Sequence, residues 1–111
     1  MKFQLDSLFK KELFKDVFVR LINGSEITLN FFELRSDEVK IPLHDHPVEH
    51  LVIVLEGEIE FIVGEQKSLL KEREGLFLQA KTKHTARVLR SPVWALEIYP
   101  KTEDKYYKES E

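Results

Sequence analysis

The sequence predicts an all-β protein, folded either as an antiparallel sandwich or as a small barrel. Eight or nine short runs of β-branched, aromatic and other apolar residues follow one another from Val17 onward, and turn residues separate them at fairly regular intervals. Asn23-Gly24 stands between two such runs, which is a strong signal for a β-hairpin. Helical spacing of apolar residues is confined to one segment near the N-terminus. Together these observations favour an antiparallel β fold.

The first predicted element is a short helix or helical turn within 6–14. Leu5, Leu8, Phe9 and Leu13 recur there at helical spacing, behind an Asp or Ser that can cap a helix. It is the only segment near the start of the chain whose pattern favours a helix.

All later predicted elements are strands. Glu56-Gly57 and Gly64-Glu65 are predicted turns, because each lies between two apolar runs. The predicted strands cover 17–22, 27–34, 51–55, 59–63, 67–71, 76–80, 85–89 and 93–99.

The chain length indicates a single domain. With 111 residues and a mass of 13.1 kDa, the chain is long enough for one core and too short for two. We expect one domain over 1–111 whose core covers about 17–100. Periodicity is lost after Pro100, so 101–111 is predicted to be a mobile tail, in which Tyr106 and Tyr107 could dock back.

Leu51–Leu55 is apolar on both of its predicted faces. One face of such a strand lines the interior, and the other needs a second sheet or a partner subunit to cover it. We therefore expect a homodimer.

Composition and charge argue against several classes of partner. The formal net charge is -3 and basic residues form no stripe, which disfavours nucleic acid. No apolar stretch approaches the roughly 20 residues of a membrane helix, and charges interrupt the N-terminal segment. We expect a cytoplasmic protein without a membrane partner. No Ser-His-Asp order, Cys nucleophile or phosphate loop is present, so catalysis would depend on a bound ion.

All four histidines fall where one metal-binding pattern would place them. His44, His46 and His50 lie in the run HDHPVEH, and His84 follows well downstream. Imidazole is a common ligand of transition metals, and alternate residues of an extended chain project to the same face. The chain has no cysteine, so a metal would depend on His, Asp and Glu. Spacing alone predicts His44 and His46 as a ligand pair, with His84 as a further candidate.

These residues resemble the first motif of the cupin superfamily, which has the form HxH, three or four residues, a Glu, six residues and a Gly. His44 and His46 match the pair and Gly57 matches the glycine, while His50 occupies the position of the Glu. The later His84 matches the histidine of the second cupin motif.

The resemblance covers most of the chain, roughly 31–99. Gln79 and Lys81 stand where the second motif usually has Pro and Gly. Glu38 replaces the leading Gly of the first motif, and Val88 replaces the Asn that often trails the second. These departures concern the loops more than the candidate ligands.

The HxHPxxH arrangement looks like that of small single-domain cupins with four-histidine manganese sites. The resemblance implies a jelly-roll barrel, or double-stranded β-helix, with the ion inside and usually a dimeric assembly. It also implies that His44, His46, His50 and His84 are the metal ligands.

An all-imidazole site has predictable chemistry. Imidazole suits Fe, Ni, Cu and Zn, and Mn enters through the resemblance, so Mn or Fe is favoured and Zn, Ni or Cu are alternatives. Four neutral ligands leave the dipositive charge of the ion uncompensated, which favours a small anionic chelating molecule as the partner.

Candidate pocket residues follow from strand parity and residue type. Trp94, Phe61 and Gln79 are expected to line a substrate pocket. Glu49 has the opposite strand parity to His46, so it is expected to point outward rather than to bind the metal.

The leading functional hypothesis is a metal-dependent enzyme of the dioxygenase or the sugar-acid isomerase or lyase type. No residue in the two motifs is an obvious general acid or base, so no catalytic side chain is assigned. The alternative hypothesis is a non-catalytic module that binds or senses a metal or a small ligand.

Overall fold

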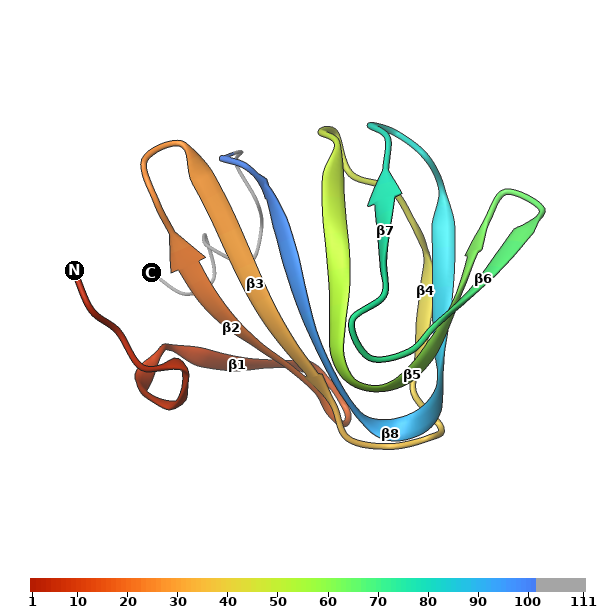
Figure 1. The fold of residues 1–111 in the computed structure, drawn as a ribbon, viewed down its shortest axis with the longest axis horizontal. Helices are drawn as coiled ribbons and strands as arrows, with labels where there is room; N and C mark the ends of the chain where they lie inside the picture. Colours follow the sequence, from red (N-terminus) through yellow and green to blue (C-terminus); the bar gives the residue numbers. More distant parts are fainter. Residues whose placement is uncertain (102–111) are drawn as a thin grey trace.

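The computed structural model describes residues 1–101, and it is nearly all β (Figure 1). One 3-10 turn, η1 (Leu5–Ser7), precedes the strands. No helix in this part of the chain is long and apolar enough to cross a membrane. The strands are β1 (Lys10–Phe14), β2 (Val17–Asn23), β3 (Ile27–Leu34), β4 (Lys40–His44), β5 (His50–Val63), β6 (Gln66–Leu70), β7 (Gly75–Leu78) and β8 (His84–Pro100).

All strand pairs are antiparallel, and the strands form two layers because β5 and β8 each run through both. The first layer has the order β1-β2-β3-β8-β5-β7 and uses the end of β8 and the start of β5. The second layer has the order β4-β8-β5-β6 and uses the start of β8 and the end of β5. In Figure 1, β1, β2 and β3 lie on one side of the molecule and β4, β6 and β7 on the other, and β8 bends from one side to the other.

The expected all-β antiparallel fold with a short N-terminal helical turn is confirmed. The pairings among residues 1–101 form a two-layer sandwich and do not close into a barrel. The Asn23-Gly24 hairpin and the Gly64-Glu65 turn are also confirmed, since β2 pairs with β3 and β5 pairs with β6 across them.

The helix predicted over 6–14 is wrong beyond its first turn. Lys10–Phe14 forms β1, which pairs with β2. The Nζ atom of Lys10 lies 5.2 Å from the centre of the Phe18 ring. Pairing with β2 satisfies the backbone polar groups on one side of this segment, and this outweighs a weak helical pattern.

Two pairs of predicted strands are each one long, bent strand. Segments 51–55 and 59–63 both belong to β5, and segments 85–89 and 93–99 both belong to β8. The Glu56-Gly57 turn predicted from the sequence is therefore a bend within a strand rather than a hairpin.

The bend depends on a close approach between β5 and β8. Their register shifts three times between Val54 and Ile59. Gly57 has a φ of +84°, and a Cβ atom there would lie 2.3 Å from the carbonyl oxygen of Pro92 and 2.7 Å from that of Arg90. Only glycine tolerates both this φ and this distance. Gly57 thus marks the point at which β5 passes from one layer into the other.

Strand β5 shows how the apolar residues divide between the core and the outer surface. Val52 and Val54 are buried in the core. Leu51 and Ile53 are half-buried, and Leu55 is exposed. Successive side chains of a strand point to opposite faces, so the outer face of the first layer is also apolar here.

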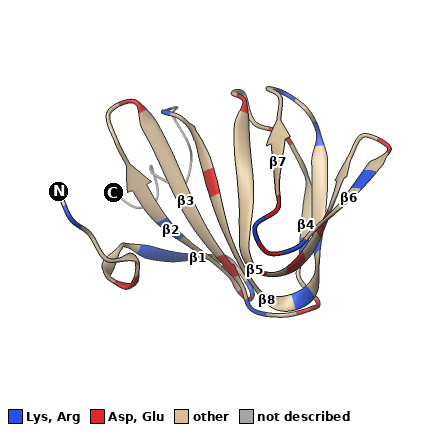
Figure 2. Cartoon of the chain, in the orientation of Figure 1, with Lys and Arg blue, Asp and Glu red and all other residues tan. Residues whose placement is uncertain are grey.

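Charged residues lie around the bend and along the β6 hairpin, and others lie on β1, on β2 and in the turns at the upper ends of the strands (Figure 2). Near the bend, the Nε atom of Arg90 lies 3.1 Å from an oxygen of Glu58, and its Nη2 atom lies 3.3 Å from an oxygen of Glu72. The Nε atom of Arg87 lies 2.9 Å from an oxygen of Glu60. Exposed ion pairs contribute little to stability, so the bend is fixed mainly by its backbone.

We expect Gly57→Ala to lower the free energy of unfolding by about 3 kcal/mol, because the added methyl group would overlap the backbone of β8. Urea denaturation followed by circular dichroism measures this loss.

Gly64→Ala is the matched control. Gly64 has a φ of +62°, yet a Cβ atom there would meet no atom within 4 Å. Its expected loss is only about 1 kcal/mol, from the left-handed backbone alone. Equal losses in the two variants would contradict the close approach at Gly57.

Candidate metal centre

The four histidines come from both layers of the sandwich. His50 is the first residue of β5 and lies in the first layer, while His84 is the first residue of β8 and lies in the second. His44 ends β4, where it pairs in register with His84. His46 lies in the loop that leads from β4 to β5. Folding the two layers over each other therefore brings the four imidazoles together.

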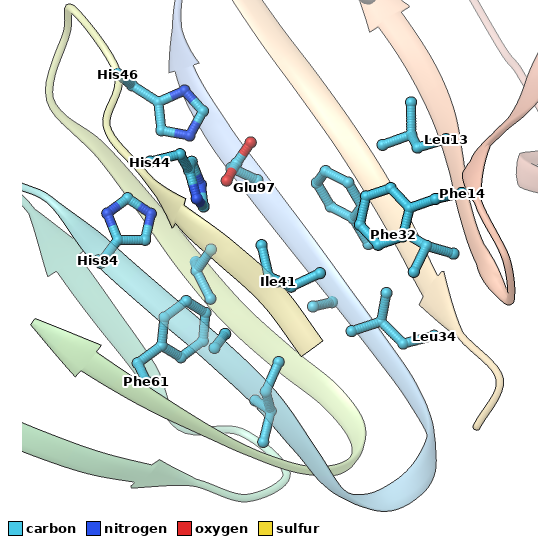
Figure 3. Close-up of a pocket in the computed structure, with 15 residues that line it drawn as sticks. Leu13, Phe14, Phe32, Leu34, Ile41, His44, His46, Phe61, His84 and Glu97 are labelled. Carbon is cyan, nitrogen blue, oxygen red and sulfur yellow. The ribbon is translucent and has the colours of Figure 1, made fainter. Parts of the chain in front are cut away.

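The imidazole rings form a continuous cluster. The ring centres of His44 and His84 are 4.2 Å apart, and those of His46 and His50 are 4.6 Å apart. His46 and His44 are 5.0 Å apart, and His50 and His84 are 6.0 Å apart. Figure 3 shows three of these rings beside Glu97 at one end of a cavity. The structure thus brings together all four histidines that the sequence singled out.

Backbone carbonyls fix the orientation of two rings. The Nδ1 atom of His44 lies 2.8 Å from the carbonyl oxygen of Pro42, and that of His84 lies 2.9 Å from the carbonyl oxygen of Thr82. A carbonyl only accepts hydrogen bonds, so each Nδ1 carries the hydrogen and each Nε2 presents its lone pair. This is the arrangement that usually supports a metal-binding histidine.

Burial favours the neutral, metal-binding form of two of the imidazoles. His50 is 4% exposed and His84 is 2% exposed. Burial lowers the pKa of His50, and the nearby rings of His84 and His44 lower it further, although the backbone at Val48 raises it in part. Burial is also the main cause of the lowered pKa of His84, although its hydrogen bond to Thr82 raises it in part. Both imidazoles are therefore neutral at pH 7, as metal ligands must be.

The donor atoms fit a metal ion. They form two overlapping groups, His44 with His46 and His84, and His46 with His50 and Glu97, in which all donor atoms lie within 4.8 Å of one another. Neither ring nitrogen of the buried His50 makes a well-formed hydrogen bond to any described residue. Buried polar groups normally have such partners, and only one nitrogen of a ring can bind a given ion, so His50 offers one candidate donor atom here.

A backbone contact holds the loop that carries His46. The N–H of Lys81 donates a hydrogen bond of 2.7 Å to the carbonyl oxygen of His46. Lys81 has a φ of +61°, a conformation that favours glycine. It occupies the position where the second cupin motif usually has Gly, and it adopts a backbone conformation that a Gly would favour.

A buried polar network beside the histidines was not predicted from the sequence. Glu97 on β8 is 8% exposed. The side-chain amide of Asn30 on β3 donates hydrogen bonds to Oε1 of Glu97, at 3.2 Å, and to the hydroxyl of Tyr99, at 2.8 Å. The only local signal was a Glu and an Asn within strands that are otherwise largely apolar. That signal does not say to which face either residue points.

Beyond the histidines lies a cavity of about 90 Å³ with an almost entirely apolar lining. Phe32, Ile41 and Phe61 are part of its wall (Figure 3). The polar residues among its lining are His44, His46, His84 and Glu97, all of which belong to the two donor groups.

Of the three predicted pocket residues, the structure places one at the cavity. Phe61 lies in its wall. Trp94 does not line it and instead packs edge-on against Phe31, with ring centres 5.1 Å apart. Gln79 is exposed and does not line it. Glu49 is exposed, in agreement with the outward orientation expected for it.

Sequence comparison identifies the family. The cupin domain family matches residues 30–99, which is more than half of the chain. The chain belongs to the cupin family. None of the curated proteins matches its sequence.

Solved cupin structures are similar to this chain in fold at low sequence identity. KdgF from Halomonas sp. superimposes with a TM-score of 0.84 at 12% identity, covering 94% of this chain and 96% of that one. An RmlC-like cupin from Shewanella frigidimarina gives a TM-score of 0.81 at 12% identity, covering 91% and 90%. A variant of oxalate decarboxylase from Bacillus subtilis gives 0.80 at 14% identity, covering 95% of this chain but 30% of that one. These similarities establish a shared fold.

The lowered pKa values predict that the metal-free protein loses stability in mild acid. The unfolded chain protonates its histidines near pH 6.5, whereas His50 and His84 in the folded chain protonate only at lower pH. Their contribution is therefore complete above about pH 6.5 and is lost as the pH falls from there toward the lowered pKa values.

Urea denaturation of the metal-free protein at about pH 7.5 and about pH 5.5 measures this effect. We expect a smaller free energy of unfolding at the lower pH, and a weaker pH dependence in His50→Gln. A wild-type protein equally stable at both values would contradict the prediction.

Proposed function

We propose that this cupin is a metal-dependent enzyme that acts on a small anionic chelating molecule. The observation that carries the proposal is the convergence of four imidazoles from two layers, with a donor atom of the buried His50 within 4.8 Å of donor atoms of His46 and Glu97. His44, His46, His50 and His84 would hold the ion. When bound, the ion would supply a Lewis acid that polarises a substrate oxygen.

A divalent transition metal, Mn or Fe, fits this proposal best. The donors are imidazoles with a carboxylate nearby and no thiolate, a combination that suits several first-row metals. Zn, Ni and Cu are the alternatives. Among the solved structures of similar fold is oxalate decarboxylase from Bacillus subtilis, described as having Mn(II) centres. That neighbour supports manganese as the first metal to test.

The lining of the cavity indicates which parts of the substrate are polar and which are apolar. Chelating oxygens would lie at the histidine end, and the remainder of the molecule would contact apolar groups such as Ile41 and Phe61. The hydroxyl groups of a sugar acid need hydrogen-bond partners, and this wall offers almost none. Of the two reaction types expected from the sequence, the lining therefore favours the dioxygenase type over the sugar-acid type.

The assembly state stays a prediction. The apolar outer face of the first layer, which includes Leu51 and Ile53, is the surface through which we propose that two copies associate as a homodimer.

His46→Ala tests the metal centre, because His46 belongs to both donor groups. We expect about one ion per chain in the wild type after incubation with Mn(II) and desalting, and less than about a tenth of that in the variant. Elemental analysis measures the content. Lys83→Ala changes an exposed neighbour of His84 and should retain the ion. Equal metal content in wild type and His46→Ala would remove the proposed centre.

Turnover separates an enzyme from a binding module. The protein loaded with Mn(II) or Fe(II) is offered short diketones, enediols, 2-oxo acids and sugar acids, with oxygen consumption and product formation recorded. We expect turnover of an apolar chelator at least about tenfold faster than of any sugar acid. Saturable binding without turnover across the panel would favour the non-catalytic alternative.

A further inference from the structure

We propose that Glu97 is a fifth protein ligand of this centre and supplies the carboxylate that the first cupin motif lacks in this chain. The inference rests on the proposed metal site. In the motif, the carboxylate belongs to the residue that is His50 here. Glu97 approaches His50 from β8, 40 residues after Gly57 of the motif.

The position of Glu97 follows from the pairing of β5 with β8. In this register Val52, which lies two residues after His50, pairs with Glu97. The Nε2 atom of His50 lies 3.6 Å from Oε2 of Glu97. Two donors that each lie about 2.1 Å from one ion are separated by about 3.0 Å at right angles and about 4.2 Å when opposite. The observed separation falls between these values, so both atoms can bind the same ion.

The two oxygens of Glu97 have different surroundings. Oε1 accepts the hydrogen bond from the Asn30 amide, while Oε2 faces His50. A metal-binding carboxylate commonly has one oxygen oriented by a hydrogen bond in this way. Asn30 is fully buried, so this orientation is fixed within the core rather than by a mobile surface group.

His46 connects Glu97 to the rest of the cluster. It shares one donor group with His50 and Glu97 and the other with His44 and His84. The single ion that we propose would lie where the two groups meet. With one carboxylate among the ligands, a divalent ion would keep a net charge of about one positive unit, which still favours an anionic ligand.

Mn(II) affinity of the metal-free protein, measured by isothermal titration calorimetry, tests the role of Glu97. We expect Glu97→Gln to weaken Mn(II) binding at least about tenfold, because the amide has nearly the same shape but no negative charge. Glu97→Ala should lose as much, and added formate should restore part of its affinity by supplying a carboxylate in the space that opens.

The electron paramagnetic resonance spectrum of bound Mn(II) gives a second readout. We expect its fine structure in Glu97→Gln to differ from that of the wild type, since a ligand would have changed. Azide should bind the Mn(II) form of Glu97→Gln more tightly than that of the wild type, because the centre gains a unit of positive charge. A role confined to packing would not increase the affinity for an anion.

Glu49→Gln is the matched control. Like Glu97→Gln, it removes one negative charge, here from the residue that precedes His50. Unlike Glu97, Glu49 is exposed. We expect its Mn(II) affinity and spectrum to match the wild type. Circular dichroism of the metal-free variants checks their folding, and Glu97→Asp, which keeps the charge, should bind Mn(II) more tightly than Glu97→Gln.

The outcomes separate this inference from the proposed function. A wild type that binds no Mn(II) overturns the metal centre itself. A wild type that binds Mn(II) with the same affinity and spectrum as Glu97→Gln leaves the metal centre in place and overturns the role of Glu97. A loss in Glu49→Gln without one in Glu97→Gln likewise overturns it.

Discussion

The structure depends on the pairing of β5 with β8 along almost their whole length and on the bend that the two strands share. His50 and Glu97 lie at one end of this ribbon, and His84 lies at the other. The bend at Gly57 folds the two ends toward each other, so the ring centres of His50 and His84 come within 6.0 Å. The same backbone approach therefore forms the sandwich and assembles the candidate metal centre.

The inside of the sandwich is divided into a polar end and an apolar end. Histidines and Glu97 gather at one end, and Phe32, Ile41 and Phe61 line the other. Burial of imidazoles is costly for their charged form, and it keeps them neutral and available to a metal. The apolar wall offers few hydrogen-bond partners, so recognition of a polar ligand would depend on the ion and its donors.

The departures from the cupin motifs have different consequences. Lys81 stands where the motif usually has a glycine and has a positive φ, and its N–H holds the loop that carries His46. The change to His50 alters the chemistry, because it exchanges a carboxylate for an imidazole within the cluster. Glu97 places a carboxylate close to that imidazole from another strand. Motif positions thus differ in whether their backbone or their side chain matters.

The sequence by itself determined the antiparallel β class, the hairpins at Asn23-Gly24 and Gly64-Glu65, and the four histidines, because alternation, turn chemistry and ligand spacing are local patterns. Only the tertiary structure decided that Glu97 rather than Trp94 faces the cavity. The segment around both residues is largely apolar, so parity alone gives no contrast between its faces. The Asn30–Glu97 contact joins residues 67 positions apart, and strand topology rather than local sequence brings them together.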